Sequence, residues 1–228
     1  MMKKMMLVTV ALIASLTVNA QREVGKLTVQ PKIGFGASNI TKVEQSYTYF
    51  TTNTTDKMDK SVATAALLGA EFEYQLTPMF SVAAGLTYTI QGAQWNDYKF
   101  QFKNQYIEFT DNIIELQYAN LPIVLNAYVA KGFALKAGVQ LGYLTSAKYK
   151  YTIDSNIPGQ INGTIESKDY KDDCKKLDVS IPFGASYEYS NFVFDLRYHL
   201  GLTPINKNGA KEYKNSVFML TFGYRFDI

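Results

Sequence analysis

Apolar and polar residues alternate with a period of two along most of this chain. Between Phe80 and Gln91 one row of side chains is wholly apolar, and the other row is small or polar. Successive side chains of a β-strand point to opposite faces, whereas a helix repeats every 3.6 residues. The segment therefore predicts a strand with one apolar face, and the pattern recurs elsewhere in the chain.

Eight such strands can be counted. They are expected at about Leu27 to Ala37, Ala66 to Leu76, Phe80 to Gln91, Leu116 to Val129, Phe133 to Tyr143, Leu177 to Tyr189, Phe192 to Gly201 and Phe218 to Phe226. The fourth is irregular, because Leu116 and Tyr118 share one phase while Leu121 and the apolar residues after it share the other. A bulge near Ala119 and Asn120, just before a proline, would restore a single apolar face.

The links between these strands alternate in length. Tight links are expected at Thr77-Pro78, Lys131-Gly132 and Ser190-Asn191, and segments of roughly ten to thirty residues join the other strands. Outer-membrane barrels have short periplasmic turns and long exterior loops. An even number of strands also places both ends of the mature chain on the periplasmic side.

The less apolar face of each strand indicates which solvent the strands meet. It mixes Gly, Ala and Ser with isolated ions, whereas the outside of a soluble β protein should be uniformly hydrophilic. Such a mixture suits the narrow lumen of eight strands, where acids and bases pair. The ions expected on this surface are Glu71, Glu73, Asp178, Glu188, Asp195, Lys32, Lys136, Arg197 and Arg225. A transmembrane barrel is therefore favoured over a soluble β fold, which stays the alternative.

Composition agrees with an exported β protein. Hydrophobic residues make up 47% of the 228 residues, with 17 Tyr and 14 Phe, and this excludes a disordered chain. A net charge of +3 gives no reason to expect nucleic-acid binding. Residues 1–20 are expected to be a signal peptide, with Lys3 and Lys4 before an apolar core and Ala20 at the cleavage site. Residues 21–228 would then form one barrel domain, which cannot contain a disulfide because Cys174 is the single cysteine.

Five strand segments together carry a resemblance to a known family. They are Gly85-Leu86-Thr87-Tyr88-Thr89-Ile90-Gln91-Gly92, Tyr118-Ala119-Asn120-Leu121-Pro122-Ile123, Gly138-Val139-Gln140-Leu141-Gly142-Tyr143, Arg197-Tyr198-His199-Leu200-Gly201-Leu202 and Gly223-Tyr224-Arg225-Phe226. These segments resemble the PorT-like, OmpX-like outer-membrane β-barrel proteins of Bacteroidetes. Their order and spacing, which span most of the mature chain, carry the resemblance. It implies an eight-stranded up-and-down barrel, OmpX/OmpA-like, in the outer membrane. It implies little about activity.

No chemistry stands out, and we expect no catalytic, cofactor or metal site. His199 is the single histidine, and Asp195 lies four residues earlier on the same face, roughly 13 Å away along a strand. A lipid-acting enzyme would need a partner from another strand, so we assign His199 to the lumen network. Glu71 and Glu73 could form an acid pair, but lumen packing is the favoured interpretation.

The sequence also gives no reason to expect a metal site or a nucleotide site. Asp169, Asp172 and Asp173 lie among lysines and indicate a solvated surface rather than a calcium site. Gly34-Phe35-Gly36 indicates a strand with small lumen residues rather than a phosphate loop.

The loops are therefore the remaining candidates for a functional surface. Aromatic residues stand among polar ones in the first loop (Tyr47, Tyr49, Phe50) and in the second (Trp95, Tyr98, Phe100, Phe102, Tyr106, Phe109). They suit a binding surface, and they suit better strands that extend beyond the bilayer as a stiff hairpin. Asn162-Gly163 could turn a similar hairpin in the third loop.

These observations predict a non-enzymatic outer-membrane barrel with a structural or interaction role and a plugged polar lumen. We expect a monomer in outer-membrane lipid, with an extracellular ligand or protein as the partner of the loops. A small pore and a lipid-acting enzyme remain the alternatives.

Overall fold

The computed structural model describes residues 22–41, 46–48, 55–57, 59–160, 162–166, 171–207 and 212–228. The expected signal peptide, residues 1–20, lies outside the described residues. Eight long strands dominate the rest: β1 (Leu27–Thr41), β5 (Ala63–Gln75), β6 (Phe80–Trp95), β8 (Gln105–Ala130), β9 (Phe133–Ser155), β11 (Leu177–Tyr189), β12 (Phe192–Gly201) and β13 (Lys214–Tyr224). Over these ranges, no helix has the length and apolar character that a membrane crossing requires.

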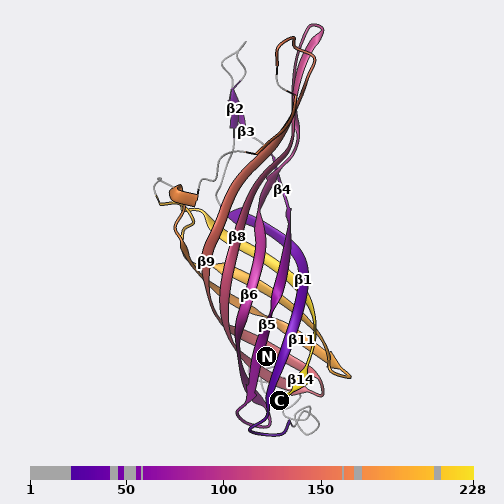
Figure 1. The fold of residues 1–228 in the computed structure, drawn as a ribbon, viewed down its shortest axis with the longest axis vertical. Helices are drawn as coiled ribbons and strands as arrows, with labels where there is room; N and C mark the ends of the chain where they lie inside the picture. Colours follow the sequence, from indigo (N-terminus) through magenta and orange to yellow (C-terminus); the bar gives the residue numbers. More distant parts are fainter. Residues whose placement is uncertain are drawn as a thin grey trace, which may run out of the picture.

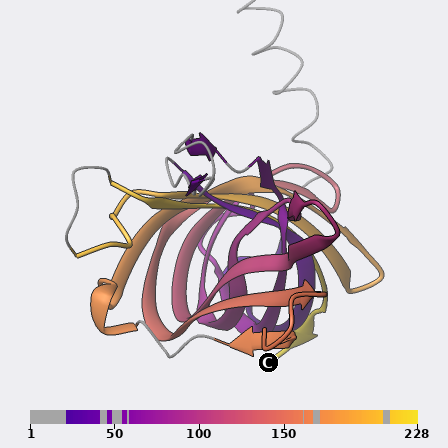
Figure 2. The same ribbon diagram turned by 90° about the horizontal axis from the view of Figure 1, so that it is seen from above.

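The eight long strands form a closed antiparallel ring (Figures 1 and 2). Each strand pairs with the next long strand along the chain, from β1 with β5 to β12 with β13. The ring closes where β13 returns to β1, with Leu220 opposite Phe35. The eight-stranded up-and-down barrel predicted from the alternation is confirmed, and closure leaves the ring itself without an unpaired edge.

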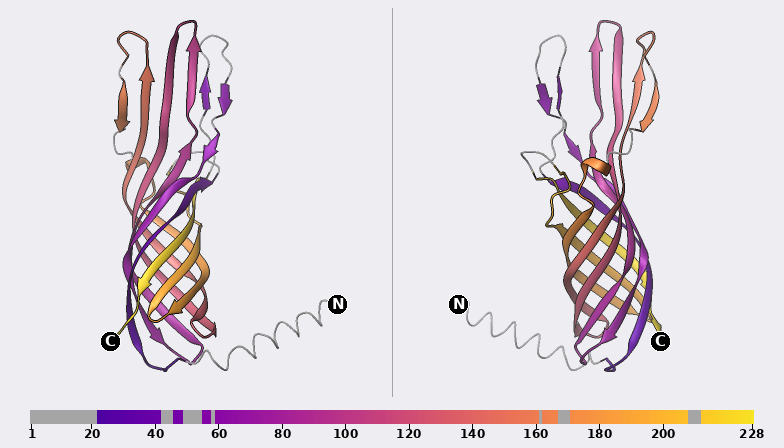
Figure 3. Two further views of the ribbon diagram at one scale, coloured as in Figure 1. Left: turned by 90° about the vertical axis from the view of Figure 1, so that its right-hand side faces the viewer. Right: turned by 60° about the vertical axis from the view of Figure 1, so that its left-hand side comes forward.

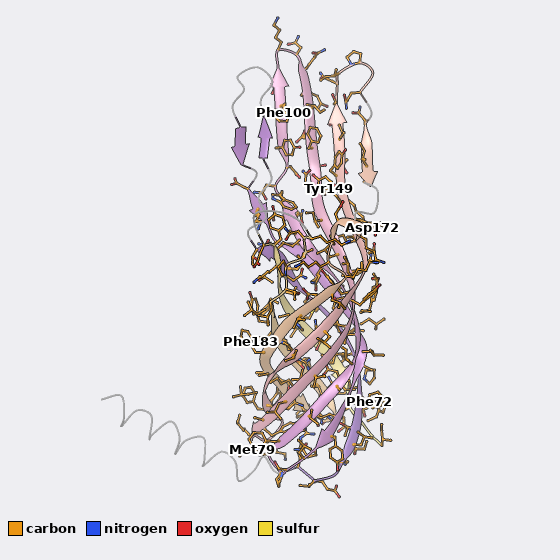
Figure 4. The ribbon with its side chains drawn as sticks, turned by 90° about the vertical axis from the view of Figure 1, so that its left-hand side faces the viewer. Phe72, Met79, Phe100, Tyr149, Asp172 and Phe183 are labelled. Carbon is orange, nitrogen blue, oxygen red and sulfur yellow. The ribbon has the colours of Figure 1, made fainter. Side chains whose placement is uncertain are left out.

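The tight links predicted between strands lie together at one end of the barrel. Met79, beside the first of them, lies at that end in Figure 4, and the C-terminus lies there in Figure 1. Ser190 and Asn191 have φ angles of 48° and 72°. A two-residue hairpin of type I′ requires positive φ at both central residues, because this twist matches the twist of the flanking strands.

The outside of the barrel is apolar. Leu86 exposes 73% of its surface, Phe35 66% and Leu68 63%. Phe72 and Phe183 project away from the barrel wall in Figure 4. Exposed apolar area on this scale is far larger than soluble monomers carry, so these rows meet hydrocarbon.

The apolar outer row ends at a defined level. On β9 it runs from Phe133 to Tyr143, which at about 3.4 Å per residue and a tilt of roughly 40° covers about 25 Å of bilayer. Beyond Thr145 the outer row changes to Lys148 and Lys150, which lie opposite Glu115 and Ile113 of β8. At the same level the inner row becomes apolar, beginning with Leu144. The two faces exchange polarity because water replaces lipid outside the strands.

Above this level, several strands form an extension (Figure 3). β7 (Tyr98–Phe102), β8, β9 and β10 (Gly163–Glu166) make a four-stranded antiparallel sheet in that order. The hairpin predicted for the second loop is confirmed as β7 paired with β8. Smaller elements are β2 (Ser46–Thr48) paired with β3 (Thr55–Lys57), β4 (Lys60–Ser61) paired with β6, β14 (Phe226–Asp227) paired with β1, and a 3₁₀ turn at Lys171–Asp173.

The predicted bulge at Ala119 and Asn120 is wrong. Every second residue of β8 from Leu116 to Tyr128 is buried, so the strand keeps one phase. The pairing passes from Gln117 opposite Ser146 to Tyr118 opposite Leu144, which makes Thr145 of β9 the additional residue. Leu116 and Tyr118 therefore face the interior.

The turn predicted at Asn162-Gly163 is also wrong. The chain turns after Ser155, with Gln160 N donating to Ile157 O at 3.1 Å. Gly163 is already the first residue of β10 and lies opposite Ile153. The Pro158-Gly159 dipeptide, with φ of 82° at the glycine, supplies the turn instead.

Candidate functional site

Charged side chains from four strands meet in the middle of the lumen. We call this set the central cluster: Lys32 of β1, Glu71 of β5, Lys136 of β9, and Asp195 and Arg197 of β12. Lys32 Nζ lies 2.7 Å from Glu71 Oε2 and 3.7 Å from Asp195 Oδ2. Lys136 Nζ lies 2.8 Å from Asp195 Oδ2. Each member exposes at most 5% of its surface, so these ions contact one another rather than water.

Arg197 links the two carboxylates of the central cluster. Its Nη1 and Nη2 donate to the two oxygens of Glu71 at 2.7 and 2.8 Å. Its Nε donates to Asp195 Oδ1 at 2.9 Å. The planar guanidinium group suits such a two-sided bridge, because its donors form a fixed fork.

Glycines make room for these long side chains. Gly184 lies opposite Arg197, and a Cβ there would meet Leu196 O at 1.9 Å. Gly85 lies opposite Glu71, and a Cβ there would meet Ala70 O at 2.1 Å. The expectation that small lumen residues accommodate paired ions is confirmed at both positions.

A second charged set closes the end that carries the short turns. Arg225 Nη2 lies 2.9 Å from Glu73 Oε2, and Arg225 Nε lies 3.0 Å from Glu188 Oε2. Arg22, which precedes β1, lies 2.5 Å from the same Glu188 oxygen, and its Cζ lies 4.1 Å from the ring centre of Tyr128. Tyr128 donates its hydroxyl to Glu73. We call these five residues the periplasmic cluster, because the short turns are expected on the periplasmic side.

All members of the periplasmic cluster except Tyr128 line a cavity of about 180 Å³ at the mouth of the barrel. Glu73 and Thr28 line the cavity. Glu71 and Lys32 lie two and four residues deeper in the barrel on the same strands, and they do not line it. The cavity therefore ends below the central cluster.

The opposite end of the lumen is apolar. Trp95, Leu116 and Leu144 are fully buried there. They belong to one cluster that also contains Ile40, Ala93, Tyr118, Ala147, Cys174 and Ile205, and we call it the outer plug. Below it, Asn215 Nδ2 donates to the hydroxyl of Tyr118 at 3.2 Å and to Asp178 at 3.3 Å.

The chemical candidates from the sequence lie in these layers. Glu71 belongs to the central cluster and Glu73 to the periplasmic cluster, so each is paired with different cations. His199 is 8% exposed and borders the central cluster, and no hydrogen bond joins it to Asp195 among the described contacts. Asp169 lies outside the described residues. In the ranges that the structure covers, no group of three or more His, Cys, Asp or Glu side chains could hold a metal ion.

The sheet of β7, β8, β9 and β10 is expected outside the cell, and we call it the extracellular sheet. It has one aromatic and one polar face. On the aromatic face, Tyr98 stacks on Phe109 with ring centres 4.8 Å apart. The ring centres of Phe109 and Tyr151 lie 6.2 Å apart. Figure 4 shows Phe100 and Tyr149 in this part of the molecule. Of the first-loop aromatics, Tyr49 and Phe50 lie outside the described residues.

The polar face carries pairs of opposite charge. Lys99 Nζ lies 3.1 Å from Glu108 and 4.2 Å from the ring centre of Tyr106. Tyr106 donates its hydroxyl to Asp154 at 3.2 Å. This hydrogen bond, together with the carboxylate's charge, raises the pKa of Tyr106 above its usual 10.

Two parts of this arrangement were missed by the sequence analysis. Arg22 stands outside any alternating segment, so nothing in the pattern places it in the lumen. The sequence did contain a sign of the outer plug, because Leu116 and Tyr118 are out of phase with the apolar row that follows them. That signal was taken for a bulge.

The barrel and its apolar belt agree with the family comparison. Residues 19–207 match the family model described as outer membrane protein beta-barrel domain. The chain belongs to this family. Its barrel therefore lies in the outer membrane, with the apolar rows in outer-membrane lipid. Among curated proteins, no match was found.

Two solved barrels illustrate the likeness in fold. The attachment invasion locus protein Ail of Yersinia pestis, solved with the heparin analogue sucrose octasulfate, is 15% identical, with 90% of this chain and 100% of that chain covered and a TM-score of 0.39. Neisserial surface protein A is 10% identical, with 88% and 97% covered and a TM-score of 0.44.

Proposed function

We propose that this barrel is a non-enzymatic outer-membrane protein with a closed lumen, and that its role is to hold the extracellular sheet as an interaction surface. One observation carries the proposal: Arg197 of β12 and Glu71 of β5, whose strands are not neighbours in the ring, join across the lumen in a buried, ion-paired cluster. The outer plug lies beyond it and the periplasmic cluster before it.

A closed lumen follows from the cost of moving these charges. An ion that passed the central cluster would have to separate buried pairs that water does not reach, and removing one partner leaves a buried charge uncompensated. The outer plug adds a dry, close-packed layer at the other end. We therefore expect purified protein in planar lipid bilayers to show no unitary conductance steps. Steady channel openings would support the alternative of a small pore.

An extracellular role requires that the sheet lie outside the cell. The exposed tip of the β7–β8 hairpin carries Asn104, and the opposite end carries the exposed residue Pro78. We would introduce Asn104→Cys or Pro78→Cys after Cys174→Ala, and treat intact cells with a membrane-impermeant maleimide. Labelling of the first variant alone supports the proposal, and labelling of the second alone contradicts it.

The non-enzymatic part has its own test. His199 is enclosed in the lumen, where an acyl chain or a lipid headgroup has no room to reach it. We expect lipid turnover in reconstituted vesicles to be the same for the native protein, for His199→Ala and for empty vesicles. Turnover that His199→Ala abolishes would support the lipid-acting enzyme instead.

The narrower relationship and the assembly state belong to this proposal as well. The strand motifs described above support a place among the PorT-like proteins of Bacteroidetes. The closed ring supports a monomer, because every barrel strand already has two neighbours. Chemical cross-linking in native membranes should therefore leave the chain at its monomer mass.

A further inference from the structure

We propose that the lumen holds a site for one buried monovalent anion the size of chloride, beside His199. The site is a cavity of about 10 Å³ on the edge of the central cluster. Its polar lining comes from Thr87 of β6, Gln140 of β9, His199 of β12 and Thr221 of β13, together with Lys32, Arg197 and Glu71. The carboxylate of Glu71 is ion-paired with Lys32 and Arg197. This site is independent of what the extracellular sheet binds.

Three unpartnered groups identify the cavity as a binding site. Thr87 Oγ1, Thr221 Oγ1 and His199 Nδ1 are buried and make no hydrogen bond in the described part of the chain. The three residues expose 6%, 4% and 8% of their surfaces. Buried polar atoms are almost always hydrogen-bonded, so three of them around one cavity point to a shared ligand. All three can act as donors, since a hydroxyl rotates and a neutral imidazole carries one N–H.

The charge of the central cluster decides between an anion and a water molecule. Three cationic side chains, Lys32, Lys136 and Arg197, face two carboxylates in mutual contact. The excess is one positive charge, and a buried charge requires a partner or a hydrogen-bonded counter-ion. Lys32 and Arg197 belong to both the cluster and the cavity wall. A monovalent anion there would neutralise the cluster. It would also accept hydrogen bonds from Thr87, Thr221 and His199.

Size and lining exclude the other common ligands. At about 10 Å³ the cavity has room for one species of about the size of a water molecule, so sulfate or a phosphate ester does not fit. A metal cation would have to sit against Lys32 and Arg197, which repel it. Leu67, Pro122 and Met219 complete the wall with apolar contacts. A halide, which is weakly hydrated and has no preferred bond direction, fits both kinds of lining.

Bromide provides a direct structural test. Crystals of the full barrel grown in bromide should show an anomalous-scattering peak between Thr87, His199 and Thr221. Density for a water molecule at that position, without an anomalous peak, would overturn the proposal.

A second test follows stability in solution. A ligand that binds only the folded state raises the unfolding midpoint as its concentration rises. We would record heat-induced unfolding in detergent micelles in sodium chloride and in sodium gluconate at equal ionic strength. The native protein should unfold at a higher temperature in chloride, and the difference should grow with the logarithm of chloride concentration.

Matched variants assign this effect to the site. Thr221→Val keeps the shape of the side chain and removes one donor, and Thr87→Val does the same from another strand. Either variant should lose most of the chloride response. Thr28→Val is the control, because Thr28 is equally buried in the lumen but does not line this cavity. Equal midpoints in the two salts, or a response that Thr221→Val and Thr87→Val both keep, would contradict the anion site.

Discussion

Arg197 and Glu71 face each other across the lumen through two parallel hydrogen bonds of 2.7 and 2.8 Å, although 126 positions separate them in the sequence. Two strands, β13 and β1, lie between their own strands in the ring. The pair therefore connects parts of the wall that share no backbone hydrogen bonds. The closed lumen that we propose rests on this geometry.

Removing one side of this pair should destabilise the barrel strongly. Glu71→Ala removes the carboxylate that Arg197 and Lys32 share in a site that water does not reach. The free energy of unfolding should therefore fall by about 3 kcal/mol or more. The measurement is urea-induced unfolding in lipid vesicles. Glu108→Ala is the control, because its partner Lys99 is solvent-exposed at the extracellular sheet and such pairs contribute little. If both variants lowered the free energy of unfolding equally, burial would not determine how much an ion pair stabilises this barrel.

The outer plug should behave as a packed protein core. Trp95 is 0% exposed, and Trp95→Ala should cost about 3 to 5 kcal/mol through lost contacts and the cavity left behind. Leu86, which is 73% exposed to lipid, provides the comparison. Leu86→Ala leaves no internal cavity, so its unfolding free energy should change less. A smaller effect at Trp95 than at Leu86 would mean that the plug is not close-packed.

The Ser190-Asn191 turn contains strain that glycine would relieve. Both residues have positive φ, which for a residue with a Cβ costs roughly 1 kcal/mol. Ser190→Gly should therefore raise the free energy of unfolding by about 0.5 to 1 kcal/mol, and Ser190→Val should lower it. Refolding into detergent micelles, followed by heat-modifiable gel mobility, measures both. If valine proves neutral, the turn does not adopt positive φ at this position.

Glu115 should make the extension sensitive to acid. It lies on β8 above the apolar rows, where partial burial raises its pKa but hydrogen bonds from Lys150 and Gln117 lower it more. The net pKa is below the usual 4.5. A depressed carboxyl pKa contributes stability above the unfolded value, and this stability is lost as the pH falls through the folded value.

An NMR titration of the Glu115 carboxyl in micelles checks this expectation. The midpoint should lie below 4.5 in the native protein and move upward in Lys150→Met, which removes one hydrogen bond and one positive charge. Local amide exchange of the β8–β9 extension should accelerate in the same pH range. A midpoint at or above 4.5 in the native protein would show that the Lys150 contact does not form.

Much of the barrel could be predicted from local patterns. The eight strands, the three short turns and the lipid-facing rows depend on alternation and turn chemistry, which act over a few residues. The lumen-facing charges were also predicted as a set, because a polar residue in a lipid-facing strand has one low-energy side to occupy.

The errors arose where the surroundings change along a strand. In β8, Leu116 and Tyr118 were taken for lipid-facing residues displaced by a bulge, since the pattern was assumed to have one meaning throughout. The strand instead leaves the bilayer, and its inner face then packs a dry plug while its outer face meets water. The same residue type has opposite preferred faces on the two sides of that boundary.

The sequence by itself determined the period, the number of strands, the positions of the short turns and the side of the wall on which each spanning residue lies, because these follow from neighbours in the chain. Only the tertiary structure decided which charges meet. The stagger between strands sets the height of each side chain in the lumen, and it depends on closing all eight strands at once. For that reason the partnership of Arg197 with Glu71 and the cavity beside His199 became visible only in the closed ring.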